Sequence, residues 1–242
     1  MIKRLLKDNI NSLLSHIGVR ISKIEQRDTE FSRVVSILED RNVNVLIDVG
    51  ANIGQYAREL RLHGWGNQII SFEPISEAYE ILKSRAQRDK NWHIYEKCAI
   101  AERNGKVDLQ ISHNLVSSSI LQISETHINA APRSKVIRTE TVPVRTLDSC
   151  LSDYISNADI LAIKIDVQGL EFAVLSGANQ ILSQTKVLQV ELSLAPLYRG
   201  QSDWREVIDH IVGAGFQLHA IFEGFVDNNT GATLQIDALF VK

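Results

Sequence analysis

The chain has 242 residues, of which 44% are hydrophobic and 23% charged, and its formal net charge is −3. This length suits one sizeable α/β domain with a small appendage, and the charge gives no support to broad nucleic-acid binding. Cys98 and Cys150 form no Cys-x-x-Cys pair, so we expect no disulfide framework but two reduced thiols in a cytoplasmic protein. No apolar run is long enough to span a membrane.

The N-terminal segment, residues 1–41, precedes the main domain, which we place at 42–242. Apolar residues at helical spacing predict an amphipathic helix, or two short ones, over residues 2–24. Its basic residues are not followed by an uninterrupted apolar stretch, so we expect no signal peptide. The apolar stripe can dock on the main domain, on a second copy in a homodimer, or on a membrane surface. Docking on protein is favoured because the basic content is low.

The main domain alternates between predicted strands and helices. Strands are expected at 45–49, 69–72, 93–98, 160–167 and 187–192, and helices at 31–38, 54–62, 76–88, 147–155, 171–182 and 204–214. This alternation predicts right-handed βαβ crossovers and a parallel sheet with helices on both faces.

Two regions depart from this alternation. Residues 104–144 predict a small β insertion with a polar serine-containing loop, because an Asn-Gly turn is followed by alternating apolar and polar residues. Near the end, strands predicted at 218–222 and 238–241 flank a turn at 227–231, which predicts an antiparallel hairpin. The main sheet should therefore contain about seven strands.

The first two strands predict a nucleotide-type pocket. An apolar run ends at Asp48, turns at Gly50 and opens a helix near Gly54, and a second apolar run ends at Glu73. Glycines let the backbone approach a ligand closely. Glu73 follows Gly50 by 23 residues, close to the spacing of about 20 for an acid that binds both hydroxyls of a ribose.

Four carboxylates stand at the ends of predicted parallel strands. They are Asp48, Glu73, Asp166 and Glu191. The carboxyl ends of such strands line the ligand crevice of an open α/β sheet, whereas a single acid there is more often a cap or a loop anchor. Because buried charges without partners are costly, four acids at one edge favour a functional site.

A second dense cluster follows one of these strands, in Lys164-Ile-Asp166-Val-Gln-Gly169-Leu-Glu171. Lys164 and Asp166 lie two residues apart on a strand and so share a face. Gly169 permits a tight turn, and Glu171 falls in the first turn of the next helix, where the helix dipole favours an anion. The alternative is a buried structural ion pair with a helix cap.

Together these motifs resemble those of the FkbM-type S-adenosylmethionine-dependent methyltransferases, over about residues 42–242. The matching segments are Asp48-Val-Gly-Ala-Asn-Ile-Gly54-Gln-Tyr56, Ser71-Phe-Glu-Pro74, Cys98-Ala-Ile100, Thr146-Leu-Asp148, Lys164 to Glu171, and Val190-Glu191. The resemblance implies a class I methyltransferase Rossmann-like fold, an α/β fold with a seven-stranded, mostly parallel sheet. A C-terminal antiparallel hairpin is typical of such sheets.

The resemblance also implies the roles of the cofactor-binding residues. Gly50 and Gly54 would leave room for the methionine part of S-adenosylmethionine, while Asp48 and Asn52 would contact its amino and carboxylate groups, directly or through water. Glu73 would bind the ribose, Pro74 would shape the adenine wall, and Cys98 and Ala99 would flank the adenine. Gln55 and Tyr56 complete the first cofactor-binding motif.

Family members generally methylate hydroxyl oxygens of sugars and natural-product scaffolds, so a base near the acceptor oxygen is expected. Asp166 is the first candidate, and Lys164 is the second or else orients Asp166. Glu191 and Glu171 could bind acceptor hydroxyls. In a variant of this mechanism, Asp166 and Glu191 hold a divalent cation that lowers the pKa of the hydroxyl.

Acceptor contacts are expected from Ser119, Tyr198, Arg199, Trp204 and the loop 113–135. The partner is then a small-molecule or glycan acceptor, and no nucleic acid or integral membrane segment is expected.

Two other classes of function stay open. An NAD(P)-dependent Rossmann oxidoreductase predicts Gly-x-Gly-x-x-Gly after the first strand, but Asn52 stands where that pattern needs glycine. A non-catalytic S-adenosylmethionine-binding module is the other, and the cluster around Lys164 argues against it.

Overall fold

The computed structural model describes residues 29–242. The helix predicted at 2–24, and any dimer contact through it, fall outside these residues. Within the described part, no helix is long and apolar enough to cross a membrane.

The described chain contains both predicted kinds of element. Its helices are α2 (Glu30–Asp40), α3 (Gln55–Leu62), α4 (Ser76–Ala86), α5 (Glu125–Ala130), the 3-10 helix η2 (Pro132–Ser134), α6 (Leu147–Leu151), α7 (Glu171–Ser176), α8 (Asn179–Gln184) and α9 (Trp204–Gly213). Its strands are β1 (Val45–Val49), β2 (Gln68–Phe72), β3 (Trp92–Ile94), β4 (Ala99–Ile100), β5 (Gly105–Ser112), β6 (Gln122–Ile123), β7 (Val136–Arg145), β8 (Leu161–Ile165), β9 (Thr185–Ser193), β10 (Tyr198–Arg199), β11 (Gln217–Glu223) and β12 (Gln235–Val241).

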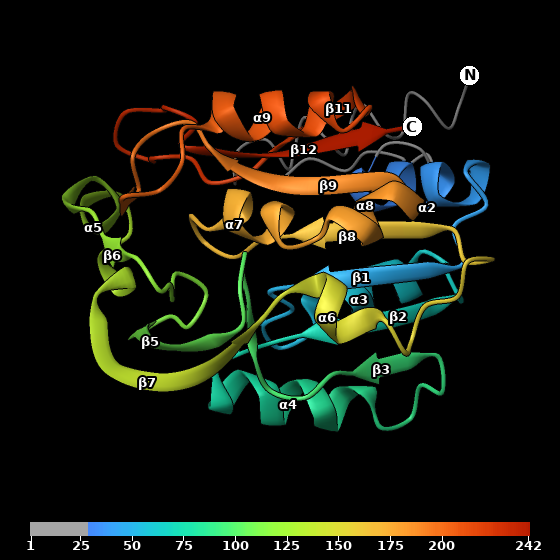
Figure 1. Ribbon diagram of the computed structural model, residues 1–242. Helices are drawn as coiled ribbons and strands as arrows, with labels where there is room; N and C mark the ends of the chain where they lie inside the picture. The colour runs from blue at the N-terminus through green and yellow to red at the C-terminus, as the bar shows by residue number, and fades with distance from the viewer. Residues whose placement is uncertain (1–28) are drawn as a thin grey trace, which may run out of the picture.

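The central sheet has seven strands in the order β11-β12-β9-β8-β1-β2-β3 (Figure 1). The five strands from β9 to β3 in this order are parallel, and β12 runs antiparallel to both β9 and β11. This confirms the predicted fold class, a mostly parallel seven-stranded sheet that ends in an antiparallel hairpin.

Helices cover both faces of this sheet, so the domain has three layers. The side chains of β1 alternate between the two faces, because Val45, Ile47 and Val49 belong to one buried cluster and Leu46 to the other. The first cluster includes residues of α6, α7, α8 and α9, and the second includes residues of α2, α3 and α4. The inner strands β1, β2 and β8 are therefore buried on both faces, and any polar residue within them needs a partner.

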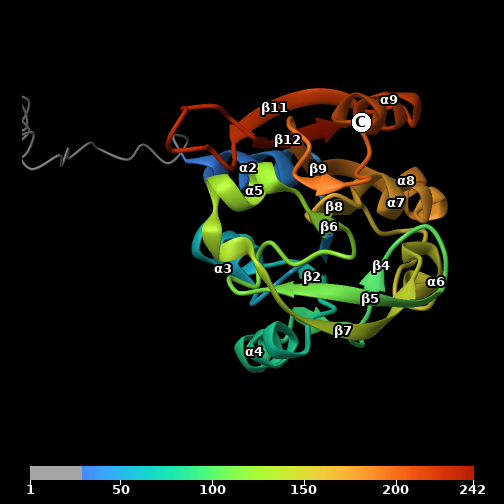
Figure 2. The same ribbon diagram turned by 90° about the vertical axis from the view of Figure 1, so that its left-hand side faces the viewer.

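A second region lies at the end of the sheet to which β1 and β8 point (Figure 1). It contains a three-stranded sheet in the order β4-β7-β5 and a two-stranded pairing of β10 with β6. Figure 2 looks at the molecule from this side and shows β5, β6, β7 and α5 in front of the central sheet. The segment predicted as an insertion at 104–144 thus lies where ligands bind in open α/β sheets.

Two elements differ from the expected ones. The strand expected at 93–98 pairs with β2 only through β3, because the chain then leaves the sheet and pairs with β7 as β4. The helix expected at 171–182 is broken into α7 and α8 at Gly177. A Cβ at Gly177 would lie 2.3 Å from the carbonyl oxygen of Ala101, so the chain passes that backbone too closely for a side chain.

Gly50, in the loop after β1, lies against the backbone of Asp166 and leaves no room for a side chain. Its φ is +80°, and a Cβ there would lie 1.8 Å from the carbonyl oxygen of Asp166. We expect Gly50→Ala to lower the free energy of unfolding by at least about 3 kcal/mol, measured by urea denaturation, because a backbone atom cannot move aside.

Gly64→Ala is the matched control, since Gly64 has a φ of +92° but no atom within 4 Å of its Cβ position. It should cost about 1 kcal/mol, the strain of a left-handed backbone alone. Equal losses in the two variants would contradict the proposed contact.

Candidate functional site

A row of buried polar side chains crosses the centre of the sheet. Ser71, Asp48, Lys164 and Gln189 are register partners on the adjacent strands β2, β1, β8 and β9. All four are buried. The residue two positions earlier on each strand shares its face and belongs to the buried cluster that includes α2 and α3, so the row points toward that face; these residues are Ile69, Leu46, Ala162 and Val187. The four residues therefore lie side by side and form one polar row across four neighbouring strands.

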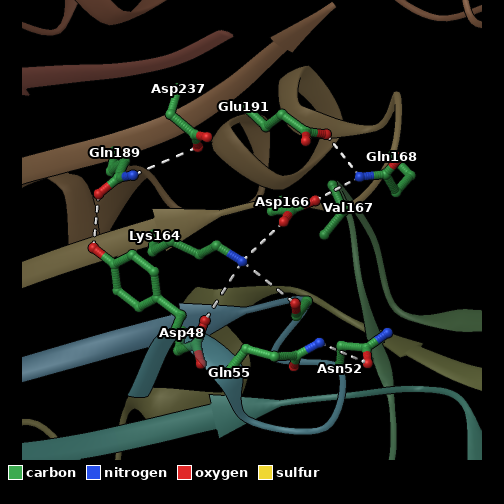
Figure 3. Close-up of polar contacts among 12 residues, drawn as sticks. Asp48, Asn52, Gln55, Lys164, Asp166, Val167, Gln168, Gln189, Glu191 and Asp237 are labelled. Atoms are coloured by element: carbon green, nitrogen blue, oxygen red, sulfur yellow. Dashed lines mark hydrogen bonds and ion pairs between the residues drawn. The ribbon is translucent and has the colours of Figure 1, made fainter. Parts of the chain in front are cut away.

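The Lys164 ammonium lies between two carboxylates and a carbonyl (Figure 3). Its Nζ is 3.1 Å from Asp166 Oδ2, 3.8 Å from Asp48 Oδ1, and donates to the carbonyl oxygen of Gly50 at 3.4 Å. Burial alone lowers the pKa of Lys164, but the charges of Asp166 and Asp48 outweigh it and raise the pKa above its usual value. This raised pKa favours the protonated form of Lys164, and its contact with Asp166 is the geometry of a group that orients that carboxylate.

Asp48 lies behind Lys164 and does not line a cavity. Its Oδ2 accepts a hydrogen bond from Ser71 Oγ at 3.2 Å, and its Oδ1 has no hydrogen-bond partner. Complete burial raises the pKa of Asp48, while Lys164 opposes that shift. The carboxylate predicted at the end of the first strand thus serves mainly as the counter-charge of the lysine.

Glu73, at the end of β2, closes the loop after β1. Its Oε2 accepts from the backbone N–H of Asn52 at 2.7 Å, and its Oε1 accepts from the N–H of Ile75 at 2.8 Å. Burial raises the pKa of Glu73 to about 7, against the lowering effect of these two hydrogen bonds. Each oxygen keeps a second lone pair, so the carboxylate can still accept two hydroxyl donors.

A cavity opens beside this carboxylate, and we call it the Glu73 cavity. The predicted residues that line it are Gly50, Asn52, Glu73, Pro74, Cys98, Ala99 and Asp166. Its remaining wall is largely apolar and includes Leu109, Leu115, Val116 and Ile120 from the insertion. An apolar slot with the Glu73 carboxylate at its side suits a flat ring attached to a sugar.

A second cavity, which we call the Tyr56 cavity, shares Gly50, Asn52, Val116 and Asp166 with the first. Its other lining residues are Glu30, Phe31, Ala51, Gln55, Tyr56, Glu59, Lys164, Gln189 and Asp237. Tyr56 donates its hydroxyl to Gln189 Oε1 at 2.7 Å, and its ring lies 5.5 Å from that of Phe31. This cavity combines carboxylates, amides and two aromatic rings.

Asp166 stands where the two cavities meet, and Gln168 connects it to Glu191. The Gln168 Nε2 donates to Asp166 Oδ1 and to Glu191 Oε2, both at 2.7 Å (Figure 3). Gln235 donates to the same Glu191 oxygen at 2.7 Å. Burial, and then the charges of Asp166 and Asp237, raises the pKa of Glu191 well above its usual range.

A cation bound by Asp166 and Glu191 would have to displace this amide. Across residues 29–242, no three or more His, Cys, Asp or Glu side chains are grouped so that they could hold a metal ion.

Several predicted residues lie outside the lining of both cavities. Gly54 backs onto the indole of Trp92, where a Cβ would be 2.6 Å from a ring carbon. Glu171 accepts the N–H groups of Val167 and Gly169, and so fixes the turn after β8. Burial raises the pKa of Glu171 to about 7.

Some of the residues predicted to contact the acceptor also line a cavity, and others do not. Ser119 is buried and donates to the carbonyl oxygen of Gln168 at 2.7 Å, so it anchors the turn. Tyr198 is buried too, while Arg199 is exposed and Trp204 packs against the main core. Of the loop 113–135, Leu115, Val116, Ser118 and Ile120 reach the Glu73 cavity.

The site residues that were not predicted include Gln168, Gln189 and Asp237. Gln189 and Asp237 each stand between two apolar residues of a strand, a signal that could have been used. Gln168 lies within the 164–171 cluster, but its left-handed backbone (φ +58°) and its partners on β9 and β10 depend on the fold.

Comparison with known proteins agrees with this arrangement. The model of the Methyltransferase FkbM domain matches residues 48–218, which is more than half of the chain. The chain belongs to the FkbM methyltransferase family. It is an S-adenosylmethionine-dependent methyltransferase, and this decides between the two enzyme classes that its sequence motifs left open.

Two FkbM-family relatives cover most of the chain. The 2-O-methyltransferase NoeI of Sinorhizobium fredii is 28% identical over 207 residues, which are 81% of this chain and 82% of that protein. The 31-O-demethyl-FK506 methyltransferase FkbM of Streptomyces tacrolimicus is 26% identical over 212 residues, 76% of each chain. Among solved structures, an rRNA methylase from Streptococcus thermophilus matches with a TM-score of 0.48 at 10% identity, over 91% of this chain and 99% of that one. That likeness is too weak to carry an argument.

The residues present fit S-adenosylmethionine. Glu73 and the apolar walls of the Glu73 cavity suit its ribose and adenine, and Gly50 and Asn52 lie where this cavity meets the Tyr56 cavity. The buried ammonium of Lys164 beside them is neutralised by Asp48 and Asp166. A ligand with a positive sulfonium is therefore not repelled.

The raised pKa of Glu73 predicts that cofactor binding depends on pH. With a pKa of about 7, this carboxyl is mostly protonated at pH 6 and mostly ionised at pH 8. Ribose hydroxyls donate to the ionised form, so binding should release a proton. The Kd for S-adenosylmethionine should fall about tenfold between pH 6 and pH 8 in calorimetric titrations.

Titrations in two buffers of different ionisation enthalpy measure the released proton directly. In Glu73→Gln the Kd should be weaker and nearly independent of pH. A constant Kd with no proton release in the unaltered protein would contradict the role of Glu73.

The buried position of Lys164 leads to a prediction about stability. Lys164→Met leaves Asp48 and Asp166 without their cation, so the free energy of unfolding should fall by about 3–5 kcal/mol in urea denaturation. Adding Asp48→Asn to this variant should recover part of the loss. Lys186→Met, on an exposed position of β9, is the control and should change stability little. A similar small change in Lys164→Met would show that the ion pair contributes nothing.

Proposed function

We propose that this methyltransferase transfers the methyl group to a hydroxyl oxygen of a sugar, a glycan or a polyhydroxylated natural-product scaffold. The observation that carries the proposal is the position of Asp166, which lines both cavities and is hydrogen-bonded on each of its oxygens. A carboxylate so placed can receive the proton of a hydroxyl that is being methylated. The printed names of NoeI and FkbM, both O-methyltransferases, support the choice of oxygen.

The Tyr56 cavity supports the choice of acceptor. Its carboxylates and amides can pair with several hydroxyl groups, and the rings of Phe31 and Tyr56 can pack against the C–H face of a sugar. Burial, and then the charge of a neighbouring carboxylate, raises the pKa of Glu30 and Asp237 in this cavity. Such groups favour a neutral acceptor over an anionic one.

The chemistry follows from alignment and proton acceptance. When bound, S-adenosylmethionine supplies an electrophilic methyl group that an oxygen lone pair can attack in line with the departing sulfur. Asp166 accepts a hydrogen bond from the acceptor hydroxyl, which fixes the oxygen, and takes its proton as the new bond forms. Lys164 holds Asp166 in place and keeps it from repelling Asp48. A divalent cation is not needed in this scheme, because the Gln168 amide already contacts Asp166 and Glu191.

The proposed base predicts the effect of Asp166→Asn. Methyl transfer should fall by about 10²–10⁴-fold because the variant cannot take the proton, whereas the Kd for S-adenosylmethionine should stay within about threefold. The assay measures labelled methyl incorporated into a panel of neutral mono- and oligosaccharides and polyols, with the methylated atom located by nuclear magnetic resonance.

Asp153→Asn, at an exposed position before β8, is the control and should retain full activity. Turnover in Asp166→Asn equal to that of the unaltered protein would remove Asp166 from the mechanism. Incorporation on nitrogen or carbon, and none on oxygen, would contradict the proposed acceptor class.

A further inference from the structure

We infer that Gln168 is a positioning residue, whose amide bridges Asp166 and Glu191 and so aims the Asp166 carboxylate at the acceptor. The part of the inference that concerns the acceptor rests on the proposed function, in which Asp166 is the base. We call this group of contacts the Gln168 bridge; it joins Gln168 to Asp166, Glu191 and Tyr198.

Every polar atom of the Gln168 side chain is used in the bridge. The Nε2 donates one hydrogen to Asp166 Oδ1 and one to Glu191 Oε2, each at 2.7 Å, and the Oε1 accepts from the Tyr198 hydroxyl at 2.6 Å. The opposite amide orientation would place an oxygen against two carboxylates, so only this one is satisfied. With 7% of its surface exposed, Gln168 has no room to exchange these partners for water.

The backbone of Gln168 is held in an unfavourable conformation. Its φ is +58°, a left-handed value that a non-glycine side chain rarely adopts. Two contacts described above hold it there: Ser119 donates to its carbonyl oxygen, and Glu171 accepts the N–H groups on either side of it. Surroundings that enforce a strained residue point to a function for its side chain.

The bridge solves an electrostatic problem at the junction of the cavities. Asp166 and Glu191 both lie within hydrogen-bond reach of one nitrogen, and the amide donor between them offsets the repulsion that arises when both carboxyls are ionised. Lys164 holds the other Asp166 oxygen, so the carboxylate is fixed at both ends while 28% of its side chain stays exposed. A carboxylate fixed in this way presents its remaining lone pairs in a constant direction, which is what alignment of the acceptor requires.

The first test uses Gln168→Met, which keeps the length and volume of the side chain but has no donors. Without the amide, an ionised Glu191 faces Asp166 with no donor between them, which raises the pKa of Glu191 further in the folded state, so the variant should lose stability relative to the unaltered protein as pH rises. The charged and titratable groups around the bridge are Lys164, Asp166, Glu171, Glu191, Tyr198 and Asp237. The deficit in Tm relative to the unaltered protein should be larger at pH 8 than at pH 5, by about 2–4 °C.

This first arm needs no acceptor, so it tests the bridge even if the proposed function fails. An equal deficit at both pH values would overturn the inference, because a side chain that only fills space gives no pH dependence. Gln180→Met, at an exposed position on α8, is the matched control and should show no deficit.

The second arm measures kcat and cofactor affinity with an acceptor found in the methyl-uptake screen. Gln168→Met should lower kcat about a hundredfold while the Kd for S-adenosylmethionine changes less than threefold. Tyr198→Phe removes only the hydroxyl that orients the amide, so it should lower kcat about three- to tenfold and serves if Gln168→Met folds poorly. Values of kcat within threefold of the unaltered protein in both variants would overturn the positioning role, and so would a parallel loss of cofactor affinity. No methyl uptake by the unaltered protein would instead refute the proposed function.

Discussion

A buried ammonium group, that of Lys164, organises the centre of this domain. It is 6% exposed and lies between Asp48 on β1 and Asp166 after β8. A charge taken out of water is costly unless geometry and hydrogen bonds compensate it, so the two loops that follow these strands have to stay close together. The same ammonium donates to the backbone carbonyl oxygen of Gly50. It therefore connects the loop after β1 to Asp166, the residue proposed as the base. One cation therefore determines the relative position of both halves of the reaction site.

The strands β1, β2, β8 and β9 and their acids could be predicted because each is a largely apolar run with a carboxylate at or near its end. Glu73 and Asp166 could be assigned to the cavity edge for the same reason. Asp48 has the same pattern, but its neighbour in register is Lys164, and pairing between strands cannot be read from one strand alone. Gly54 shows a similar limit, since the reason for its missing side chain is the indole of Trp92, which arrives from β3.

The roles of the polar residues in and against the turn after β8 could not be predicted from the sequence. Glu171 and Ser119 have the chemistry of substrate-binding groups, yet their oxygens are bound to backbone atoms of the turn. Gln168 has a neutral amide, and its position in the sequence does not indicate that this amide connects Asp166 with Glu191. Whether a polar side chain faces a ligand or the protein's own backbone is decided by tertiary structure, and sequence spacing carries no information about it.

The close approach at Gly50 has a consequence for motion. Its backbone touches that of Asp166 with no side chain between them, and the two strands beneath are hydrogen-bonded along their whole length. The floor of the site is thus a single rigid body that cannot widen to admit a molecule. The other walls come from the insertion, through residues such as Val116, and from the start of α2 at Glu30 and Phe31. Any change of shape that accompanies binding is therefore expected in these peripheral walls and not in the floor.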